Sequence, residues 1–363
     1  DFCLSRGLGD VYKRQAMASG GDAEGSLRAA SSACGLFGLI PSRGKAPSGG
    51  PESEFMPGAG QEHVITRSVR DSAAMLDHLC GSGDAGRFFL DAVFRDPGRL
   101  RIAFCTRSPL KTPVHPECGK AVEDAARLLA SLGHHVEDAE PDIDGIAMAK
   151  STAMLLFGET GADITELRTI LGRKAVSSDV DDITWVYKLL GDSFSACDFV
   201  LAMRLWNTLS RTMDRFFHGY DLFLTPTLAS PPDALGDAGI RPADKLLGAI
   251  VSQFCKASFT KMAEVIDDLA VDSMEQNPFT RIANIAGLPA MSVPLHWTDG
   301  NLPCGVQFMG PSGCEATLLS LAGQLERACP WFHRRPPSSS PAGSQHHEHA
   351  VREHFQQQHP LGT

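Results

Sequence analysis

The sequence contains no hydrophobic run long enough to cross a membrane, although 43% of its 363 residues are hydrophobic. Charge or glycine breaks each candidate run well short of the roughly 20 apolar residues that a transmembrane helix requires. The first residues also lack the basic start, apolar middle and small-residue cleavage site of a secretion signal. We therefore expect a cytoplasmic protein without a membrane partner.

Basic residues are in the minority, with 33 Lys and Arg against 43 Asp and Glu and a net charge of −10. Such a charge opposes binding to a phosphate backbone, and no basic stripe with interleaved aromatic residues is present. Nucleic acid is therefore not an expected ligand.

Cysteine motifs are missing too. The ten cysteines are scattered and form no Cys-x-x-Cys pair, so we predict reduced thiols rather than disulfides or a zinc site. Most of them are expected to be buried in the hydrophobic core, and no metal is predicted. Cys34 has a second interpretation as a pocket residue, although core packing is favoured.

What the sequence does have is a glycine-rich turn around Ser26, within residues 20–45. We predict that its small residues let the backbone curl with N–H groups on one side. A hydroxyl beside unpaired N–H donors suits acyl transfer, with a nucleophile next to an oxyanion site. Spacing alone leaves an ordinary glycine turn as the more frequent explanation. The small residues are Gly20, Gly21, Ala23 and Gly25.

Hydrophobic periodicity predicts an α/β fold, because apolar strands alternate with amphipathic helices. Residues 143–218 have long helical periodicity, typical of core or of a cap over a cleft, and residues 44–62 are predicted to be a loop. Strands are expected at 100–105, 135–138, 222–224, 290–296 and 305–309, and helices at 68–80, 116–132, 243–272, 279–286 and 314–328.

Composition divides the chain into three parts. Residues 1–15 fit no periodic pattern and are expected to be an artefactual or disordered leader. Residues 16–335 are predicted to form one domain. Residues 336–363 are polar and of low complexity, and we expect a disordered tail whose histidines bind no metal.

The motif Gly-x-Asp-x-x-Gly-Ser-Leu-Arg at 20–28 resembles the amidase signature family. The resemblance implies an α/β/α sandwich around a mixed central sheet, with the N-terminal part of the fold missing. It extends over about residues 17–335, through HVITRSVRDSAAMLDHLCG (63–81), residues 96–109 and 115–141, YDLFLTPTLASPP (220–232) and residues 277–310.

The resemblance also implies roles for individual residues. Ser26 matches the nucleophile, and the backbone N–H groups of Ala23, Glu24, Gly25 and Ser26 match the positions that face the oxyanion. Asp22 and Arg28 match charged positions that brace the turn through buried hydrogen bonds. Residues matching pocket positions are Thr225, Thr227, Asn277, Phe279 and Asn284.

The sequence departs from the family's motif at several positions. Glu24 stands where the motif has glycine, and Ala30 where it has proline. The family activates its serine with a lysine and a second, bridging serine in a cis peptide. Before Ser26 the sequence has Lys13, Ser5 and Ser19, and neither serine lies in a Gly-Gly-Ser-Ser-Gly-Gly type of loop. We therefore expect a C-terminal fragment of an amidase, with crippled activity.

The resemblance implies hydrolysis of linear or cyclic carboxamides through a seryl acyl-enzyme, without a cofactor. Within the family it is nearest to hydrolases of small aliphatic amides and aminohexanoate cyclic dimers. The expected partner is a small-molecule amide, and a homodimer is left open. The alternatives are the amidase component of a tRNA-dependent amidotransferase, disfavoured by LERACPWFHRRPP (325–337), and a binding-only pseudoenzyme.

Overall fold

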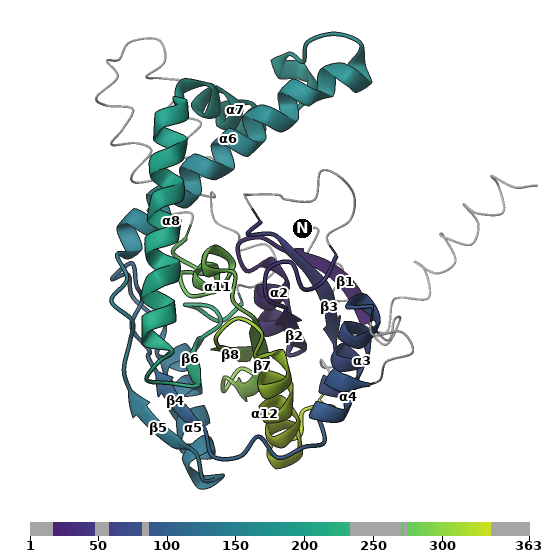
Figure 1. Ribbon diagram of the computed structural model, residues 1–363, viewed down its shortest axis with the longest axis vertical. Coiled ribbons are helices and arrows are strands. Elements are labelled where there is room, and N and C mark those ends of the chain that lie inside the picture. Colours follow the sequence, from purple (N-terminus) through teal and green to yellow (C-terminus); the bar gives the residue numbers. More distant parts are fainter. Residues whose placement is uncertain (1–16, 48–57, 82–86, 233–269, 272–273, 335–363) are drawn as a thin grey trace, which may run out of the picture. The chain divides into compact units, whose positions relative to one another are not determined.

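The strands form one mixed sheet in the computed structural model, which describes residues 17–47, 58–81, 87–232, 270–271 and 274–334 (Figure 1). The strand order is β1-β3-β2-β7-β8-β6-β4-β5. Strand β4 runs parallel to both β5 and β6, and the other neighbouring pairs are antiparallel. The strands are β1 (Met17–Asp22), β2 (Phe37–Ile40), β3 (Gln61–Thr66), β4 (Arg101–Phe104), β5 (His135–Asp138), β6 (Leu222–Pro226), β7 (Ala290–Trp297) and β8 (Pro303–Met309).

Helices cover both faces of this sheet because side chains alternate between the faces along each strand. In β4, Ile102 packs into a core with α3, α4, α5 and α12, whereas Ala103 packs into a core with α6, α7, α8 and α11. The predicted three-layer α/β/α fold is therefore confirmed. The helices are α2 (Ser26–Cys34), α3 (Val69–Leu79), α4 (Phe88–Ala92), α5 (Pro116–Ser131), α6 (Gly145–Leu171), α7 (Asp182–Ser193), α8 (Ala196–Phe216), α11 (Thr280–Ala286) and α12 (Glu315–Ala328).

Helix α2 lies close against the sheet because β2 has no side chain at Gly38. A Cβ atom built there would lie 2.1 Å from Ser31 Oγ and 2.9 Å from a methyl carbon of Leu27. Leu27 itself packs in a small core with Ile65 of β3. The helix that begins with Ser26 is thus held directly on the strands.

The predicted α/β pattern agrees with the structure wherever periodicity was strong, and residues 143–218 divide into α6, α7 and α8. Two corrections concern the N-terminal part. Gly20 and Gly21 belong to β1, paired with His63 and Glu62 of β3, so the curl is confined to the residues after Asp22. The predicted loop 44–62 ends earlier, because β3 begins at Gln61. Most of the predicted helix 243–272 lies outside the described residues, as do residues 1–15 and 336–363.

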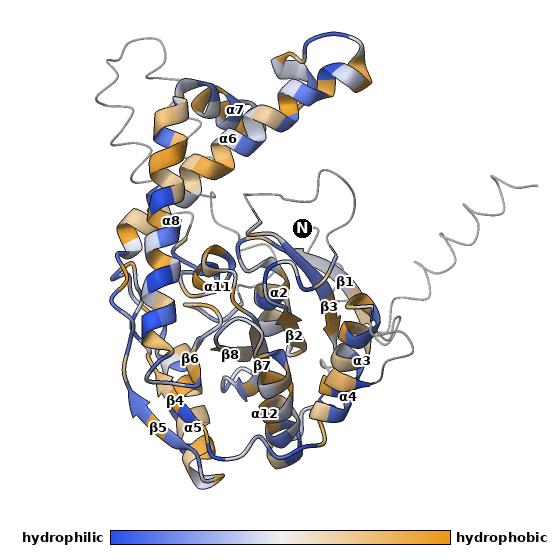
Figure 2. Ribbon diagram, in the orientation of Figure 1, coloured by the Kyte–Doolittle hydropathy of each residue, from blue (hydrophilic) through white to orange (hydrophobic). Residues whose placement is uncertain are grey.

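Helix α8 is amphipathic, and Figure 2 shows hydrophobic and hydrophilic bands along it. Its buried residues are Ala202, Trp206, Leu209 and Met213, which lie three or four residues apart and so share one face. Phe199, Val200, Leu201 and Leu205, in the N-terminal half of the same helix, are exposed. None of the described helices combines the length and the apolar character that a membrane span needs.

Candidate active site

Ser26 is the first residue of α2, and the backbone conformation of Gly25 determines how the chain enters the helix. Gly25 has a φ of 107°, in the left-handed region that favours glycine. A Cβ atom at this position would lie 2.0 Å from Thr280 Oγ1. Both the backbone conformation and the close approach of α11 therefore require glycine immediately before Ser26.

The turn is closed by the carboxylate of Asp22, at the end of β1. Its Oδ1 accepts the Gly25 N–H at 2.8 Å, and its Oδ2 accepts the Arg28 N–H at 3.3 Å. Burial opposes ionisation of Asp22, but the charge of Arg28 and the hydrogen bonds from Arg28 and Asn284 outweigh it and lower the pKa. An ionised carboxylate thus holds both ends of the turn that carries Ser26.

The buried guanidinium of Arg28 ties this turn to segments far along the chain. Its Nη1 donates to the Thr280 carbonyl at 2.9 Å and to Gln307 Oε1 at 2.6 Å. Its Nη2 donates to Asn284 Oδ1 at 2.6 Å. Asn284 in turn donates to the Asp22 carbonyl at 2.8 Å. The turn, α11 and β8 therefore form one buried polar network.

Glu24 is held on the α11 side of the turn through both its backbone and its side chain. Its carbonyl accepts the Thr280 hydroxyl at 3.0 Å and Asn277 Nδ2 at 3.5 Å. Its carboxylate Oε1 lies 2.9 Å from Arg281 Nη1. Burial lowers the pKa of Arg281, and the charge of Glu24 counteracts that effect. Arg281 is not among the residues predicted from the sequence, although an acidic residue at a glycine position is a signal for a nearby counter-ion.

Ser26 itself is half-buried. Among the described residues, its hydroxyl has no hydrogen-bond partner, and the N–H groups of Ala23, Glu24 and Ser26 have no acceptor. The Gly25 N–H differs, since it donates to Asp22. The Ser26 N–H lies at the N-terminus of α2, and those of Ala23 and Glu24 lie in the turn that leads into it. Such N–H groups can stabilise an oxyanion through hydrogen bonds, and the helix dipole adds to the effect.

The predicted pocket residues lie at different distances from the turn. Asn277 contacts the turn directly through Glu24, whereas Thr225 is linked to it through Gln307 Nε2, which donates to Thr225 Oγ1 at 3.2 Å. The hydroxyl of Thr227 is paired with Ser292 at 2.9 Å, inside the sheet. Cys34 lies at the far end of α2 from Ser26 and packs beside the small core around Leu27.

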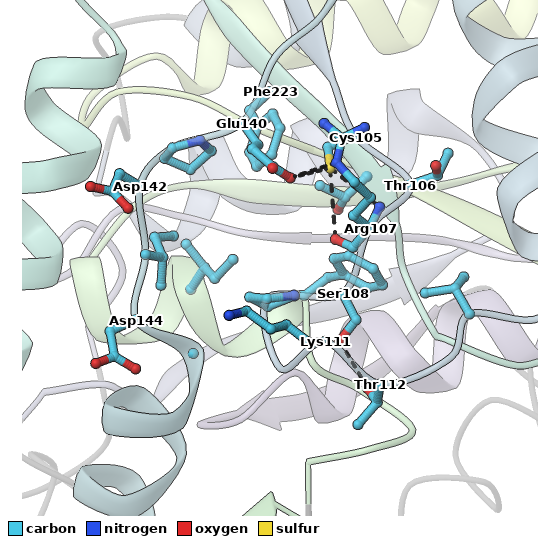
Figure 3. Close-up of a pocket in the computed structure, with 18 of the residues that line it drawn as sticks. Cys105, Thr106, Arg107, Ser108, Lys111, Thr112, Glu140, Asp142, Asp144 and Phe223 are labelled. Atoms are coloured by element: carbon cyan, nitrogen blue, oxygen red, sulfur yellow. Dashed lines mark hydrogen bonds and ion pairs between the residues drawn. The ribbon is translucent and has the colours of Figure 1, made fainter.

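A cavity of about 1070 Å³ opens beside α11, where β4, β5 and β6 end (Figure 3). Thr225 and Phe279 line it, but Ser26 is not among its described lining residues. Cys105 donates from its wall to Glu140 Oε2 at 2.8 Å, and burial together with this bond raises the pKa of the thiol to about 12. This cysteine is therefore a poor nucleophile at neutral pH.

The part of the chain that the structure describes contains no group of three or more His, Cys, Asp or Glu side chains that could hold a metal ion. The chemistry available at the turn is that of a hydroxyl, free N–H donors and buried ion pairs.

The family model named Amidase matches residues 13–319 of this sequence, which include the turn, α11 and β8. The chain belongs to the amidase signature family. The family assignment covers the elements that meet at Ser26, and it agrees with the resemblance seen in the sequence.

Among curated amidase relatives, the chain is 32% identical over 340 residues to the 6-aminohexanoate-cyclic-dimer hydrolase of Paenarthrobacter ureafaciens. The match covers 90% of this chain and 66% of that enzyme, so the chain spans less than two thirds of the relative's length. A solved 6-aminohexanoate cyclic dimer hydrolase superposes with a TM-score of 0.78 at 28% identity, covering 92% of this chain and 68% of that one. A glutamyl-tRNA(Gln) amidotransferase structure from Thermotoga maritima shares the fold alone, with a TM-score of 0.66 at 21% identity over 93% of this chain and 68% of that one.

Proposed function

We propose that the protein is an amidase that hydrolyses carboxamide C–N bonds, with Ser26 as its nucleophile. The observation that carries this proposal is the position of Ser26 at the N-terminus of α2, beside three N–H groups without acceptors among the described residues. The buried Asp22–Arg28 pair fixes that turn in place. Family membership supports the same reaction class.

In the proposed reaction, Ser26 Oγ attacks the carbonyl carbon and loses its proton. The carbonyl oxygen becomes an oxyanion, which accepts hydrogen bonds from the N–H groups of Ala23, Glu24 and Ser26. The C–N bond then breaks, and the nitrogen leaves as an amine after it gains a proton. Water hydrolyses the seryl ester and releases the carboxylic acid. The resemblance assigns the transfer of the serine proton to the leaving nitrogen to a lysine and a bridging serine.

The proposed substrate is a linear or cyclic amide without peptide character. The supporting observation is the relative whose name gives a cyclic dimer of 6-aminohexanoate as its substrate. A cytoplasmic enzyme without a cofactor, acting on a small molecule, is part of the same proposal. An amidotransferase role has weaker support, because the chain resembles the amidotransferase structure in its fold alone.

Turnover of 6-aminohexanoate cyclic dimer and of small aliphatic amides tests the proposal in protein expressed from its complete reading frame. We expect hydrolysis by the unmodified protein and a loss of at least about 1000-fold in Ser26→Ala. Ser131→Ala, at the exposed end of α5, is the matched control and should keep full activity. Amide binding without turnover in the unmodified protein would instead indicate a pseudoenzyme.

A further inference from the structure

The Glu24 side chain introduces a negative charge next to the place where the proposed reaction develops another. Glu24 lies two residues before Ser26, and its own N–H is one of the three free donors. A free carboxylate about 6 Å from an oxyanion, at an effective dielectric constant of about 20, would slow the reaction roughly 100-fold. An enzyme with glutamate at this position therefore needs a group that counteracts the negative charge of its carboxylate.

The contacts of Glu24 include such a group, the guanidinium of Arg281. Arg281 Nη1 lies 2.9 Å from Glu24 Oε1, and the two side chains are 5% and 23% exposed. The neighbouring Thr280 donates its hydroxyl to the Glu24 carbonyl at 3.0 Å. Consecutive residues of α11 thus hold the backbone and the side chain of Glu24 on one side. A pair so poorly exposed is screened much less by solvent than a surface pair.

The other charged groups near the turn do not take this role. Asp22 and Arg28 are bonded to each other on the inner side of the turn. Tyr187 of α7 lies on the Glu24 side, where burial first and the charge of Glu24 second raise its pKa. A neutral phenol does not balance a carboxylate, so Arg281 is the described cation that contacts Glu24.

We propose that Arg281 is a positioning residue for the oxyanion site: it draws the Glu24 carboxylate towards α11 and neutralises it. The inference rests on the proposed function of Ser26. It assigns Arg281 no contact with substrate and no part in proton transfer. Its effect is on the charge and the direction of the side chain at position 24.

Amide hydrolysis by Arg281→Met, with and without Glu24→Gly, tests this role. We expect kcat/KM at pH 7.5 to fall about 100-fold, because the Glu24 carboxylate is left ionised beside the oxyanion. Glu24→Gly/Arg281→Met removes both charges and should recover most of the lost activity.

Three further variants separate positioning from simple damage to the fold. Arg281→Lys keeps a cation and should retain more activity than Arg281→Met. Arg70→Met breaks an exposed pair with Asp71 on α3 and should leave activity unchanged. Glu24→Gly/Arg281→Met should fold even if Arg281→Met does not, because the double variant leaves no unpaired charge buried.

Two results would overturn the inference. One is full activity of Arg281→Met at pH 7.5. The other is a loss of activity that neither Glu24→Gly nor Arg281→Lys rescues, which would show a structural role alone. If the wild-type protein itself hydrolyses no amide, the proposed function is overturned and this inference falls with it. If the wild-type protein is active and Arg281→Met is equally active, this inference is overturned but the proposed function of Ser26 stands.

Discussion

Asp22 and Arg28 face each other through two side-chain hydrogen bonds of 2.9 Å, and both side chains are fully buried. Asp22 ends β1 and Arg28 lies in the first turn of α2, so the pair spans the turn on which Ser26 lies. The same guanidinium reaches α11 and β8 through Thr280 and Gln307. A local pair and contacts made by distant segments therefore define the geometry of one serine.

Removing the cation of this pair should destabilise the protein strongly. Arg28→Met leaves the Asp22 carboxylate buried without its counter-ion, which should lower the free energy of unfolding by about 3–5 kcal/mol. Arg101→Met breaks an exposed pair with Asp221 and should cost less than about 1 kcal/mol. Urea unfolding of both variants is the measurement, and equal losses would contradict the role assigned to Arg28.

Gly25 and Gly21 should respond very differently to alanine. At Gly25, alanine meets the positive φ and the 2.0 Å approach of Thr280 Oγ1, so we expect a loss of about 2–4 kcal/mol. At Gly21 no atom lies within 4 Å of the added Cβ, and the change should stay within about 0.5 kcal/mol. Thermal or urea unfolding compares the two, and a Gly25→Ala protein as stable as Gly21→Ala would refute this account of the turn.

His63 of β3 should make stability depend on pH. Burial lowers its pKa to about 4, and neither ring nitrogen has a hydrogen-bond partner in the described part of the chain. Between pH 6.5 and 4 the unfolded chain binds a proton that the folded chain does not. Stability should therefore fall as the pH falls through this window, by about 3 kcal/mol in total.

Two variants check the assignment to His63. In His63→Leu this part of the pH dependence should disappear, whereas His78→Gln, on the exposed side of α3, should keep it. Urea unfolding at a series of pH values gives the comparison. Parallel curves for the wild-type protein and His63→Leu would show that another group is responsible.

Much of the fold could be predicted because its signals are local. Pro116 at the first position of α5 and apolar residues at helical spacing along that helix define it without tertiary information. Strand β1 could not be predicted in this way. Its sequence, Met17–Asp22, contains two glycines and no apolar alternation, so its pairing with β3 is what makes it a strand.

The residues of the candidate site could likewise be predicted only where the sequence signal is local. Ser26 and the bracing residues Asp22 and Arg28 were predicted from one motif, because they lie within seven consecutive residues. Arg281 and Gln307, which contact Glu24 and Arg28, lie more than 250 residues further along the chain. No local pattern marks them, since it is the packing of α11 and β8 against α2 that brings them there.

The central claim, that Ser26 is the nucleophile, is tested most directly by a fluorophosphonate probe and peptide mapping by mass spectrometry. In protein expressed from its complete reading frame, we expect one adduct per chain, located on Ser26, and no adduct in Ser26→Ala. Prior incubation with an amide substrate should slow the labelling. An adduct on another residue, or equal labelling of Ser26→Ala, would contradict the account.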